Sequence, residues 1–499
     1  MRLPRASGVL LHPTSLPSKF GIGDLGPTAR QWIDQLATAG QQWWQVLPLG
    51  PTGFGDSPYQ CFSAFAGNPW LISPEDLIAE GLLELADLEP LPTFPSGRVD
   101  FGQLIPWKRS WLQRSAERLR KGVSATLTAR YEEFRQRAAG WLEDYALFSA
   151  LKDTFGGKVW SDWDADLVRR DPQALRKWRE RLALEVDTYA AWQFFFFHQW
   201  SALREYAHAR QVKIFGDVPI FVAYDSADVW VHPEMFFLDA AGKPTVVAGV
   251  PPDYFSATGQ LWGNPLYRWQ RMAEDGYRWW IERVRWTLDL VDLVRIDHFI
   301  GFVRYWEIPA GAPTAVTGRY VPGPGADFLA ALEKALGGLP LVAEDLGAVT
   351  PEVDALRDQF QLPGMKVLQF AFSSDATNRF LPHNYTRNFV AYTGTHDNDT
   401  TAGWFRTASA AERRYAREYL GRRGTDIAWD LIRLGMASVA DTFIVPAQDL
   451  LSLGSEARMN YPGKPHGNWR WQLLPGQMTQ AVWDRLANLT EVYGRRVGK

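Results

Sequence analysis

The chain of 499 residues has little of several things that would mark a specialised protein. Its single cysteine, Cys61, excludes an intrachain disulfide framework and is typical of a reducing compartment. No apolar run approaches the roughly 20 residues that a membrane-spanning helix needs. The basic N-terminus is followed by an apolar run that His12 and Pro13 interrupt, which is not the pattern of a signal peptide. We therefore expect a cytoplasmic protein with no membrane partner.

The chain also lacks an excess of charge of one sign. It carries 53 Lys and Arg against 56 Asp and Glu, for a formal net charge of -3. Nucleic acids and anionic membrane surfaces need a basic face, so we expect no nucleic-acid partner. With 46% hydrophobic residues, the composition is that of an ordinary globular protein with a large core.

Aromatic residues are what this sequence has in excess. It contains 24 Trp, 28 Phe and 17 Tyr, or 14% of the chain. Most of them are expected to fill the core. Aromatic faces also pack on the C–H faces of sugar rings, so the composition permits a carbohydrate partner without demonstrating one.

Short apolar segments recur along the chain, and several are apolar at every position, as buried parallel strands are. Helical patterns lie between many of them, for example over residues 29–39, 327–336 and 410–419. Alternating strands and helices predict an α/β fold, a (β/α)8 TIM barrel with inserted helical subdomains. The eight expected strands are residues 8–12, 43–49, 213–222, 293–299, 341–346, 365–372, 389–395 and 442–445.

Unequal gaps between these strands locate the insertions. Residues 70–212, between the second and third strands, are far longer than one barrel connection and read as an inserted helical subdomain. Its helices are expected at residues 107–121, 126–152, 172–184 and 188–211, with a buried aromatic run at 192–200. Residues 224–265 read as an inserted, loop-like region that contributes to the substrate cleft. Residues 309–325, rich in proline and glycine, read as a surface loop.

Acidic residues stand where barrel strands end, which is where active sites of such barrels lie. Asp217 ends the third strand, Asp297 the fourth and Glu344 the fifth, and Asp397 follows the seventh. Arg295 and Asp297 are two residues apart on one strand and so share a face. On its own, that pair fits a structural salt bridge as well as a functional site.

Carboxylates that converge on one barrel mouth repel each other unless their environments differ. Asp297, beside Arg295, is expected to be the ionised member. Glu344 has no adjacent cation in sequence and is the candidate for a raised pKa. The chain shows no His-Glu-x-x-His metal motif, no Gly-x-Ser-x-Gly elbow and no nucleotide-binding loop. Glycoside chemistry with two carboxylates is the reading that remains.

Eight ordered motifs make the chain resemble the 4-α-glucanotransferases, also called amylomaltases or disproportionating enzymes, which are relatives of the α-amylases. The resemblance covers essentially the whole chain. It implies transfer of α-1,4-glucan segments from a donor to glucose or a maltooligosaccharide, by a retaining mechanism with a covalent intermediate, cyclic glucans being possible products. The motifs are LHPTSLP (11–17), GDSPYQ (55–60), SAFAGNP (63–69), GDVPIFV (216–222), VRIDHF (294–299), AEDLG (343–347), THDN (395–398) and GSEARMN (454–460).

The resemblance implies roles for the three core acids. Asp297 would be the nucleophile, oriented by Arg295. Glu344 would protonate the leaving glucan and then activate the incoming 4-hydroxyl. Asp397 would bind the sugar 2- and 3-hydroxyls and help to distort the ring. No metal, nucleotide or organic cofactor is implied, and a monomer is expected.

The remaining substrate-binding residues follow from the same resemblance. Tyr59 would stack on the donor sugar, and His298 and His396 would hold neighbouring hydroxyls. The segment 249–256 and Trp262 would cover the acceptor side. Asn468 is also placed among the binding residues, whereas Asp217 is equally well explained as a structural acid.

Two rival functions stay open on the sequence. An amylase-like hydrolase on the same fold would steadily raise the number of reducing ends. A non-catalytic glycan-binding barrel would bind without turnover, although such a protein has no use for several acids gathered at one mouth.

Overall fold

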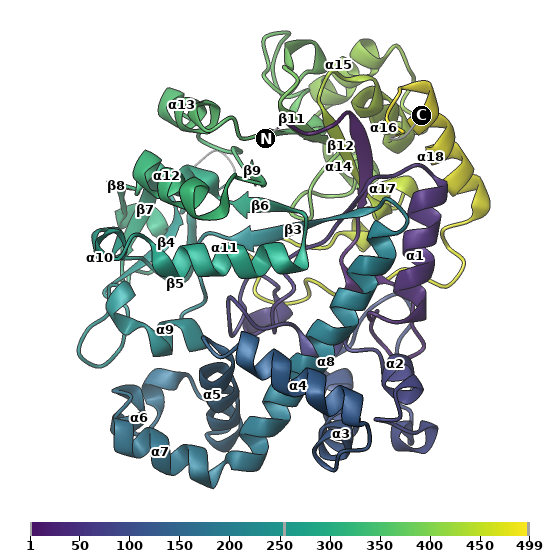
Figure 1. Ribbon diagram of the computed structural model, residues 1–499. Coiled ribbons are helices and arrows are strands. Elements are labelled where there is room, and N and C mark those ends of the chain that lie inside the picture. The colour runs from purple at the N-terminus through teal and green to yellow at the C-terminus, as the bar shows by residue number, and fades with distance from the viewer. Residues whose placement is uncertain (1, 253–255, 497–499) are drawn as a thin grey trace.

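A parallel eight-stranded sheet forms the centre of the molecule in the computed structural model, which describes residues 2–252 and 256–496 (Figure 1). Its strand order is β10-β11-β12-β1-β2-β3-β6-β9. All eight strands predicted from the sequence are confirmed, with ends that differ by a few residues. They are β1 (Ala6–Leu10), β2 (Trp43–Gln45), β3 (Lys213–Pro219), β6 (Leu293–Asp297), β9 (Leu341–Ala343), β10 (Gly364–Val367), β11 (Phe389–Tyr392) and β12 (Thr442–Pro446).

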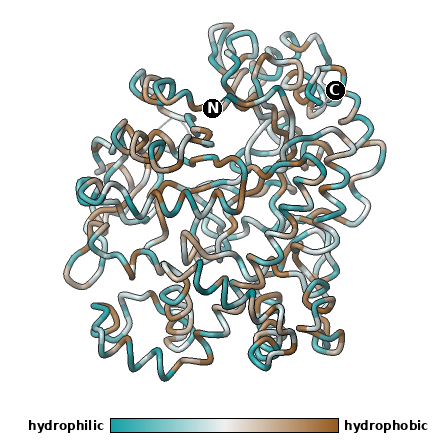
Figure 2. The backbone as a smooth tube through the Cα atoms, in the orientation of Figure 1, coloured by the Kyte–Doolittle hydropathy of each residue, from teal (hydrophilic) through white to brown (hydrophobic). Residues whose placement is uncertain are grey.

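Burial of both faces explains why these strands are so apolar. One face fills the barrel interior, where side chains such as Trp43, Phe215 and Ile444 pack together. The other face packs against the surrounding helices, through side chains such as Trp44, Ile214 and Val294. Figure 2 shows apolar residues concentrated on the central strands and many of the polar residues on the periphery.

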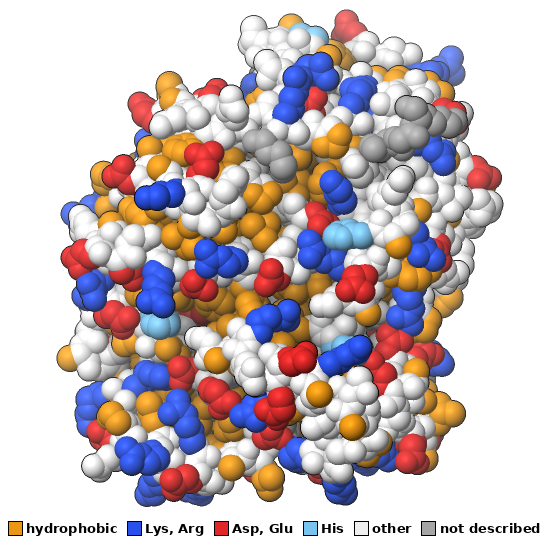
Figure 3. All heavy atoms as spheres, viewed as in Figure 1, with side chains coloured by type: hydrophobic (Ala, Val, Ile, Leu, Met, Phe, Trp, Pro, Cys, Tyr) orange, Lys and Arg blue, Asp and Glu red, His pale blue; other side chains and the backbone are white. Residues whose placement is uncertain are grey.

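Helices surround the barrel, and no helix among the described residues is both long and apolar enough to cross a membrane. Charged side chains of both signs are interspersed over the face shown in Figure 3. The helices outside the region between β2 and β3 are α1 (Pro27–Thr38), α9 (Ala227–Val231), α10 (Trp269–Glu274), α11 (Arg278–Leu290), α12 (Gly325–Leu336), α13 (Pro351–Gln359), α14 (Thr401–Thr407), α15 (Ala410–Leu420), α16 (Ile427–Ala437), α17 (Ala447–Leu450) and α18 (Gln480–Val492).

The segment between β2 and β3 is helical and lies at the bottom of Figure 1. The single helix predicted over residues 126–152 is wrong, because the chain breaks at Ala138–Trp141, around Gly140, into α4 and α5. Its helices are α2 (Pro74–Ala79), α3 (Phe101–Arg120), α4 (Ala125–Arg137), α5 (Leu142–Thr154), α6 (Ala165–Val168), α7 (Pro172–Arg181) and α8 (Ala183–His208).

Helix α8 is buried along its aromatic run, as predicted. Two glutamines in this apolar surface bind the backbone of the preceding segment. Gln193 donates to the carbonyl of Gly67 at 2.9 Å and accepts from its N–H at 2.7 Å. Gln199 does the same with Ser73, at 3.0 and 2.7 Å. In each amide both the oxygen and the nitrogen make a hydrogen bond, which lowers the free-energy cost of burying it.

A second, antiparallel sheet lies beside the barrel mouth, in the order β5-β4-β7-β8 (Figure 1). The prediction of loops at 224–265 and 309–325 is wrong for these strands. Prolines end three of them, and glycines lie within two, so the sequence suggested turns; antiparallel pairing tolerates both residues at strand ends and bulges. The strands are β4 (Val246–Val250), β5 (Gln260–Pro265), β7 (Arg304–Pro309) and β8 (Arg319–Pro322).

Candidate active site

Arg295 is the centre of a buried ion-pair cluster at the ends of β3 and β6. The parallel register sets Arg295 opposite Asp217 and Asp297 opposite Pro219. One guanidinium nitrogen donates to both Asp217 oxygens, at 2.9 and 2.8 Å, and the other donates to Asp297 Oδ1 at 2.7 Å. The Asp217 side chain is fully buried, whereas 28% of the Asp297 side chain is exposed at the barrel mouth. Asp297 is therefore the member of this cluster that a ligand reaches.

Tyr59 closes the cluster on the other side of Asp217. Its hydroxyl donates to Asp217 Oδ2 at 2.8 Å, and its ring stacks on His396 with centroids 5.0 Å apart. Burial raises the pKa of Asp217 to about 6, against the opposing charge of Arg295. The donors from Arg295 and Tyr59 keep this carboxylate ionised at neutral pH. Asp217 thus holds Arg295 and Tyr59 in position from a fully buried site.

Glu344 follows β9 and lies in a different environment. Its carboxylate accepts the backbone N–H of His298 at 2.7 Å and that of Leu346 at 3.0 Å. In the described part of the chain no ion pair reaches it, and it is 8% exposed. Burial, together with the charge of Asp297, raises the pKa of Glu344 to about 8, although Arg295 opposes the shift. The carboxyl group is thus held protonated at neutral pH.

His298 directly follows Asp297 and takes a left-handed backbone conformation, with φ of 55°. This turn aims its N–H at Glu344 and its ring at Trp262 of β5, edge to face with centroids 4.9 Å apart. Burial lowers the pKa of His298 to about 4, so the ring is neutral. The second sheet therefore brings Trp262 to the acids. Residues 253–255 of the segment predicted to cover the acceptor side lie outside the described residues.

Asp397 lies in the turn after β11 and is held by the segment 454–460. Asn460 donates to Asp397 Oδ1 at 2.6 Å, and Arg458 donates to its backbone carbonyl at 2.6 Å. Burial opposes ionisation, but His396, Asn460 and Arg295 together hold the pKa of Asp397 well below its usual range. The sequence motif 454–460 does not indicate these roles of Asn460 and Arg458, because partners about 60 residues apart in the chain leave no local pattern.

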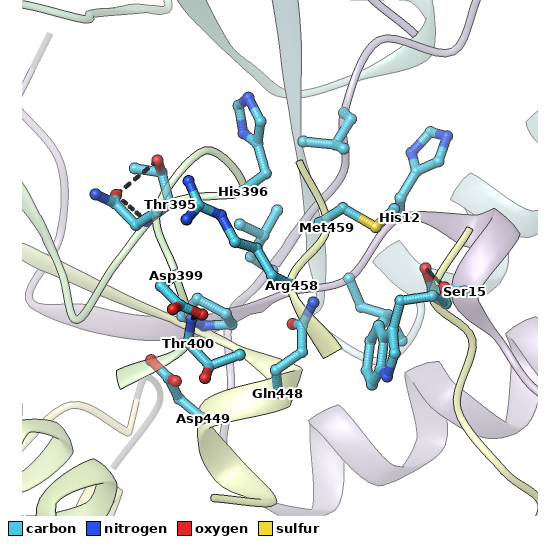
Figure 4. A pocket seen from close by; sticks show the side chains of 16 residues that line it. His12, Ser15, Thr395, His396, Asp399, Thr400, Gln448, Asp449, Arg458 and Met459 are labelled. Atoms are coloured by element: carbon cyan, nitrogen blue, oxygen red, sulfur yellow. Dashed lines mark hydrogen bonds between the residues drawn. The ribbon is translucent and has the colours of Figure 1, made fainter. Parts of the chain in front are cut away.

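A cavity of about 30 Å³, lined by both polar and apolar side chains, lies beside this turn (Figure 4). Arg458 extends toward Thr395 and His396, and His12 forms part of the wall. Burial lowers the pKa of His12 to about 3, so this ring too is neutral. The cavity leaves room for the turn to be hydrated from behind.

Asn468 is placed differently from the other predicted residues. Its Oδ1 accepts from the N–H of Tyr461 at 3.0 Å, and its Nδ2 donates to the carbonyl of Lys464 at 2.9 Å. The side chain therefore closes its own loop. The following residue, Trp469, packs on Tyr59 with ring centroids 5.7 Å apart and on His396 at 5.8 Å.

The mouth thus combines Asp297, ion-paired with an arginine, with a buried carboxyl group of raised pKa, Glu344, after the neighbouring strand. That arrangement suits general-acid chemistry beside a nucleophile or an electrostatic stabiliser. Among the described residues no group of three or more His, Cys, Asp and Glu side chains is placed to hold a metal ion. The aromatic and imidazole rings around the acids supply stacking surfaces and hydrogen-bond partners for hydroxyl groups.

Comparison with known proteins gives a consistent result. A family model for 4-α-glucanotransferases matches residues 11–478. A 4-α-glucanotransferase of Thermus thermophilus is 53% identical over 99% of this chain and 100% of its own length. That of Synechocystis sp. is 52% identical over 99% and 98%. Amylomaltase from Streptococcus agalactiae, solved in complex with acarbose, superposes with a TM-score of 0.96 at 39% identity, covering 99% of this chain and 100% of that one.

Proposed function

The chain belongs to the 4-α-glucanotransferase family, a family of enzymes, and on that premise we propose how its barrel mouth transfers an α-1,4-glucan segment by double displacement. The observation that carries the proposal is the contrast between Asp297, ion-paired with Arg295 at 2.7 Å, and the protonated Glu344. The donor is an α-1,4-glucan or maltooligosaccharide, and the acceptor is glucose or another such chain.

In the first step, Asp297 attacks the anomeric carbon of the donor while Glu344 gives its proton to the glycosidic oxygen. The bond to the leaving glucan breaks, and a covalent glycosyl ester forms on Asp297. Arg295, held by Asp217, keeps the attacking carboxylate in line. The leaving segment departs with a new 4-hydroxyl group.

In the second step, Glu344 takes the proton of the acceptor 4-hydroxyl, whose oxygen displaces Asp297 from the anomeric carbon. The charge of Asp297 is one cause of the raised pKa of Glu344. That charge is absent in the ester, so the pKa of Glu344 falls at the moment when a base is needed. Two inversions give net retention of the α configuration.

Sugar binding is proposed to fall to the residues around these acids. Asp397 accepts hydrogen bonds from ring hydroxyls, with its carboxylate fixed by Asn460. His298 and His396 offer ring nitrogens to neighbouring hydroxyls, and Tyr59 supplies a stacking face. Trp262 covers the acceptor side, where a well-held sugar competes with water for the ester.

A supply of pure maltotriose tests transfer against hydrolysis. Transfer releases glucose and builds longer oligomers while the total number of reducing ends stays constant. A steady rise in reducing ends would instead assign the site to hydrolysis, and binding without any product would assign it to a glycan-binding protein. Product sizes by chromatography and a reducing-end assay on the same samples give both quantities.

Two further points concern the oligomeric state and the compartment. We propose a monomer, because Asp297, Glu344 and Asp397 each find hydrogen-bond partners within the same barrel mouth. The single free cysteine, Cys61, supports a reducing compartment such as the cytoplasm.

A further inference from the structure

The barrel has a seam between β9 and β10. The strand ladder runs from β10 around to β9, and within the described residues these two strands are not joined to each other by it. One backbone hydrogen bond crosses the gap, from the N–H of Ala343 to the carbonyl of Pro363 at 2.8 Å. Glu344 is the next residue after this bond. The proposed acid therefore sits at the barrel's least connected strand boundary.

The side chain of Asp345 takes the place of the missing ladder. Its Oδ1 accepts the N–H of Met365 on β10 at 2.7 Å, and its Oδ2 accepts from Arg357. The Asp345 side chain is fully buried. Gly364 leaves room for it, because a Cβ at that position would lie 2.6 Å from Asp345 Oδ2.

Arg357 connects this carboxylate to α13. The guanidinium also binds Asp354 at 2.7 Å and Asp358 at 2.8 Å, both on the same helix. Two other cations face Asp345: Arg379, 3.8 Å from Oδ2, and Lys366 of β10. Asp345 is thus the buried end of an ion-pair network whose other carboxylates are 39% and 64% exposed.

Glu344 depends on the contacts of Asp345 with Met365 and Arg357, because among the described residues its own backbone is hydrogen-bonded only on the side of β6. Toward β6, its backbone N–H donates to Ile296 and its carbonyl accepts from Phe299, both at 3.1 Å. Toward β10, the anchor is the side chain of its neighbour, Asp345. If that anchor loosens, the two N–H groups that hold the Glu344 carboxylate, those of His298 and Leu346, no longer keep their relative positions.

We propose that Asp345, braced by Arg357, is a positioning residue that closes the β9–β10 seam and so fixes the Glu344 carboxyl group for proton transfer. The inference rests on the proposed role of Glu344. It assigns to Asp345 no contact with the sugar. A purely structural ion pair would affect the free energy of unfolding and leave the turnover of the folded enzyme unchanged.

Asp345→Asn is the first test, because the amide oxygen still accepts the N–H of Met365 while the ion pair with Arg357 is lost. We expect kcat for maltotriose to fall by about 100-fold, the order of effect that follows a misplacement of about 1 Å, with KM changed by less than about threefold. Loss of the negative charge of Asp345 next to Glu344 should lower the pKa of Glu344 and so move the basic limb of the pH–kcat profile to lower pH. Asp358→Asn is the matched control, since it removes an exposed partner of the same arginine and should leave both readouts near the wild type.

Arg357→Lys keeps the positive charge but cannot bind Asp345 and the two carboxylates of α13 at the same time. It is the second test, to be used if Asp345→Asn does not fold. We expect a smaller fall in kcat and a smaller change in the basic limb. A lowered Tm with unchanged kcat and pH profile in either variant, or equal effects of Asp345→Asn and Asp358→Asn, would overturn the inference. Glu344→Gln is measured alongside: if it is active, the proposed function fails, whereas an inactive Glu344→Gln with a normal Asp345→Asn refutes this inference alone.

Discussion

The ends of β6 and β9 are neighbours in the barrel and carry chemically similar side chains, Asp297 and Glu344. The surroundings of these two side chains are nevertheless opposite in character. At the end of β6, Asp297 faces a guanidinium at 2.7 Å and is partly open to solvent. At the end of β9, Glu344 is buried and held by two backbone N–H groups. Burial without an ion pair raises the pKa of a carboxyl group and favours its protonated form. A neighbouring arginine lowers the pKa and favours the ionised form.

The surroundings of the two acids therefore determine their different roles. Asp217, two strands from Glu344, makes this possible by sharing Arg295 and so fixing the guanidinium toward Asp297. Arg295 lies near Glu344 too, but its two terminal nitrogens donate to the two aspartates, and burial outweighs its effect on the pKa of Glu344.

Replacing Asp297 should have the largest effect on activity. Asp297→Asn keeps the shape and loses the nucleophile, so we expect activity on maltotriose to fall by about 10⁴-fold or more. Glucose release followed over time is the measurement, with circular dichroism to check folding. Asp289→Asn, an exposed change on α11, should behave as the wild type. Near-normal turnover of Asp297→Asn would remove the nucleophile from its proposed role.

Replacing Glu344 should have a smaller effect on kcat and should also change the pH dependence of activity. Glu344→Gln is expected to lower kcat by about 10²- to 10⁴-fold. In the wild type, activity should fall as pH rises through about 8, the pKa of Glu344, because the acid form is lost. A basic limb that persists unchanged in the residual activity of Glu344→Gln would show that another group supplies the proton.

The same residue should give a stability signature. The folded state holds the Glu344 proton up to a pKa of about 8, whereas the unfolded chain releases it near 4.5. This group's contribution to the free energy of unfolding therefore decreases as pH rises from about 4.5 to about 8. Denaturant titrations across that range should show a shallower decline in Glu344→Gln, and parallel curves for the two proteins would contradict the raised pKa.

The smallest expected effect comes from weakening the contact between Tyr59 and Asp217, which holds Arg295 beside Asp297. Tyr59→Phe removes the hydrogen bond to Asp217 and keeps the ring against His396, so we expect kcat/KM to fall by about 10-fold. Tyr59→Ala, which also removes the stacking face, should fall further. Steady-state kinetics on maltotriose separates the two variants, and equal losses would mean that the ring itself contributes nothing.

The barrel was predictable because strands buried on both faces leave a plain signal, a short run of apolar residues. The acids were predictable for a related reason: in a parallel barrel the strand ends share one rim, so position in sequence gives position in space. The ion pair of Asp297 with Arg295, two residues away, and the raised pKa of Glu344, which no cation adjoins in sequence, were also predicted from the sequence.

Other features depend on contacts that the sequence does not announce. In the antiparallel sheet, β4 pairs with β7 across 57 to 63 residues of sequence, and the prolines and glycines of its strands read as turns. The break between α4 and α5 lies at a single glycine within an otherwise helical pattern. The hold of Asn460 on Asp397 and the loop closed by Asn468 are long side-chain contacts with no local pattern.

The paired glutamines of α8 have a consequence for how the molecule opens. Gly67 and Ser73 belong to a segment with little regular structure, yet their amide protons are bonded to one helix through Gln193 and Gln199. Opening either site exposes a buried glutamine, which ties both to the undocking of α8. In a hydrogen-exchange experiment these two amides should therefore exchange slowly and at similar rates, as part of the helix's cooperative unit. The chain just beyond Tyr59 thus shares the stability of a helix more than a hundred residues away in sequence.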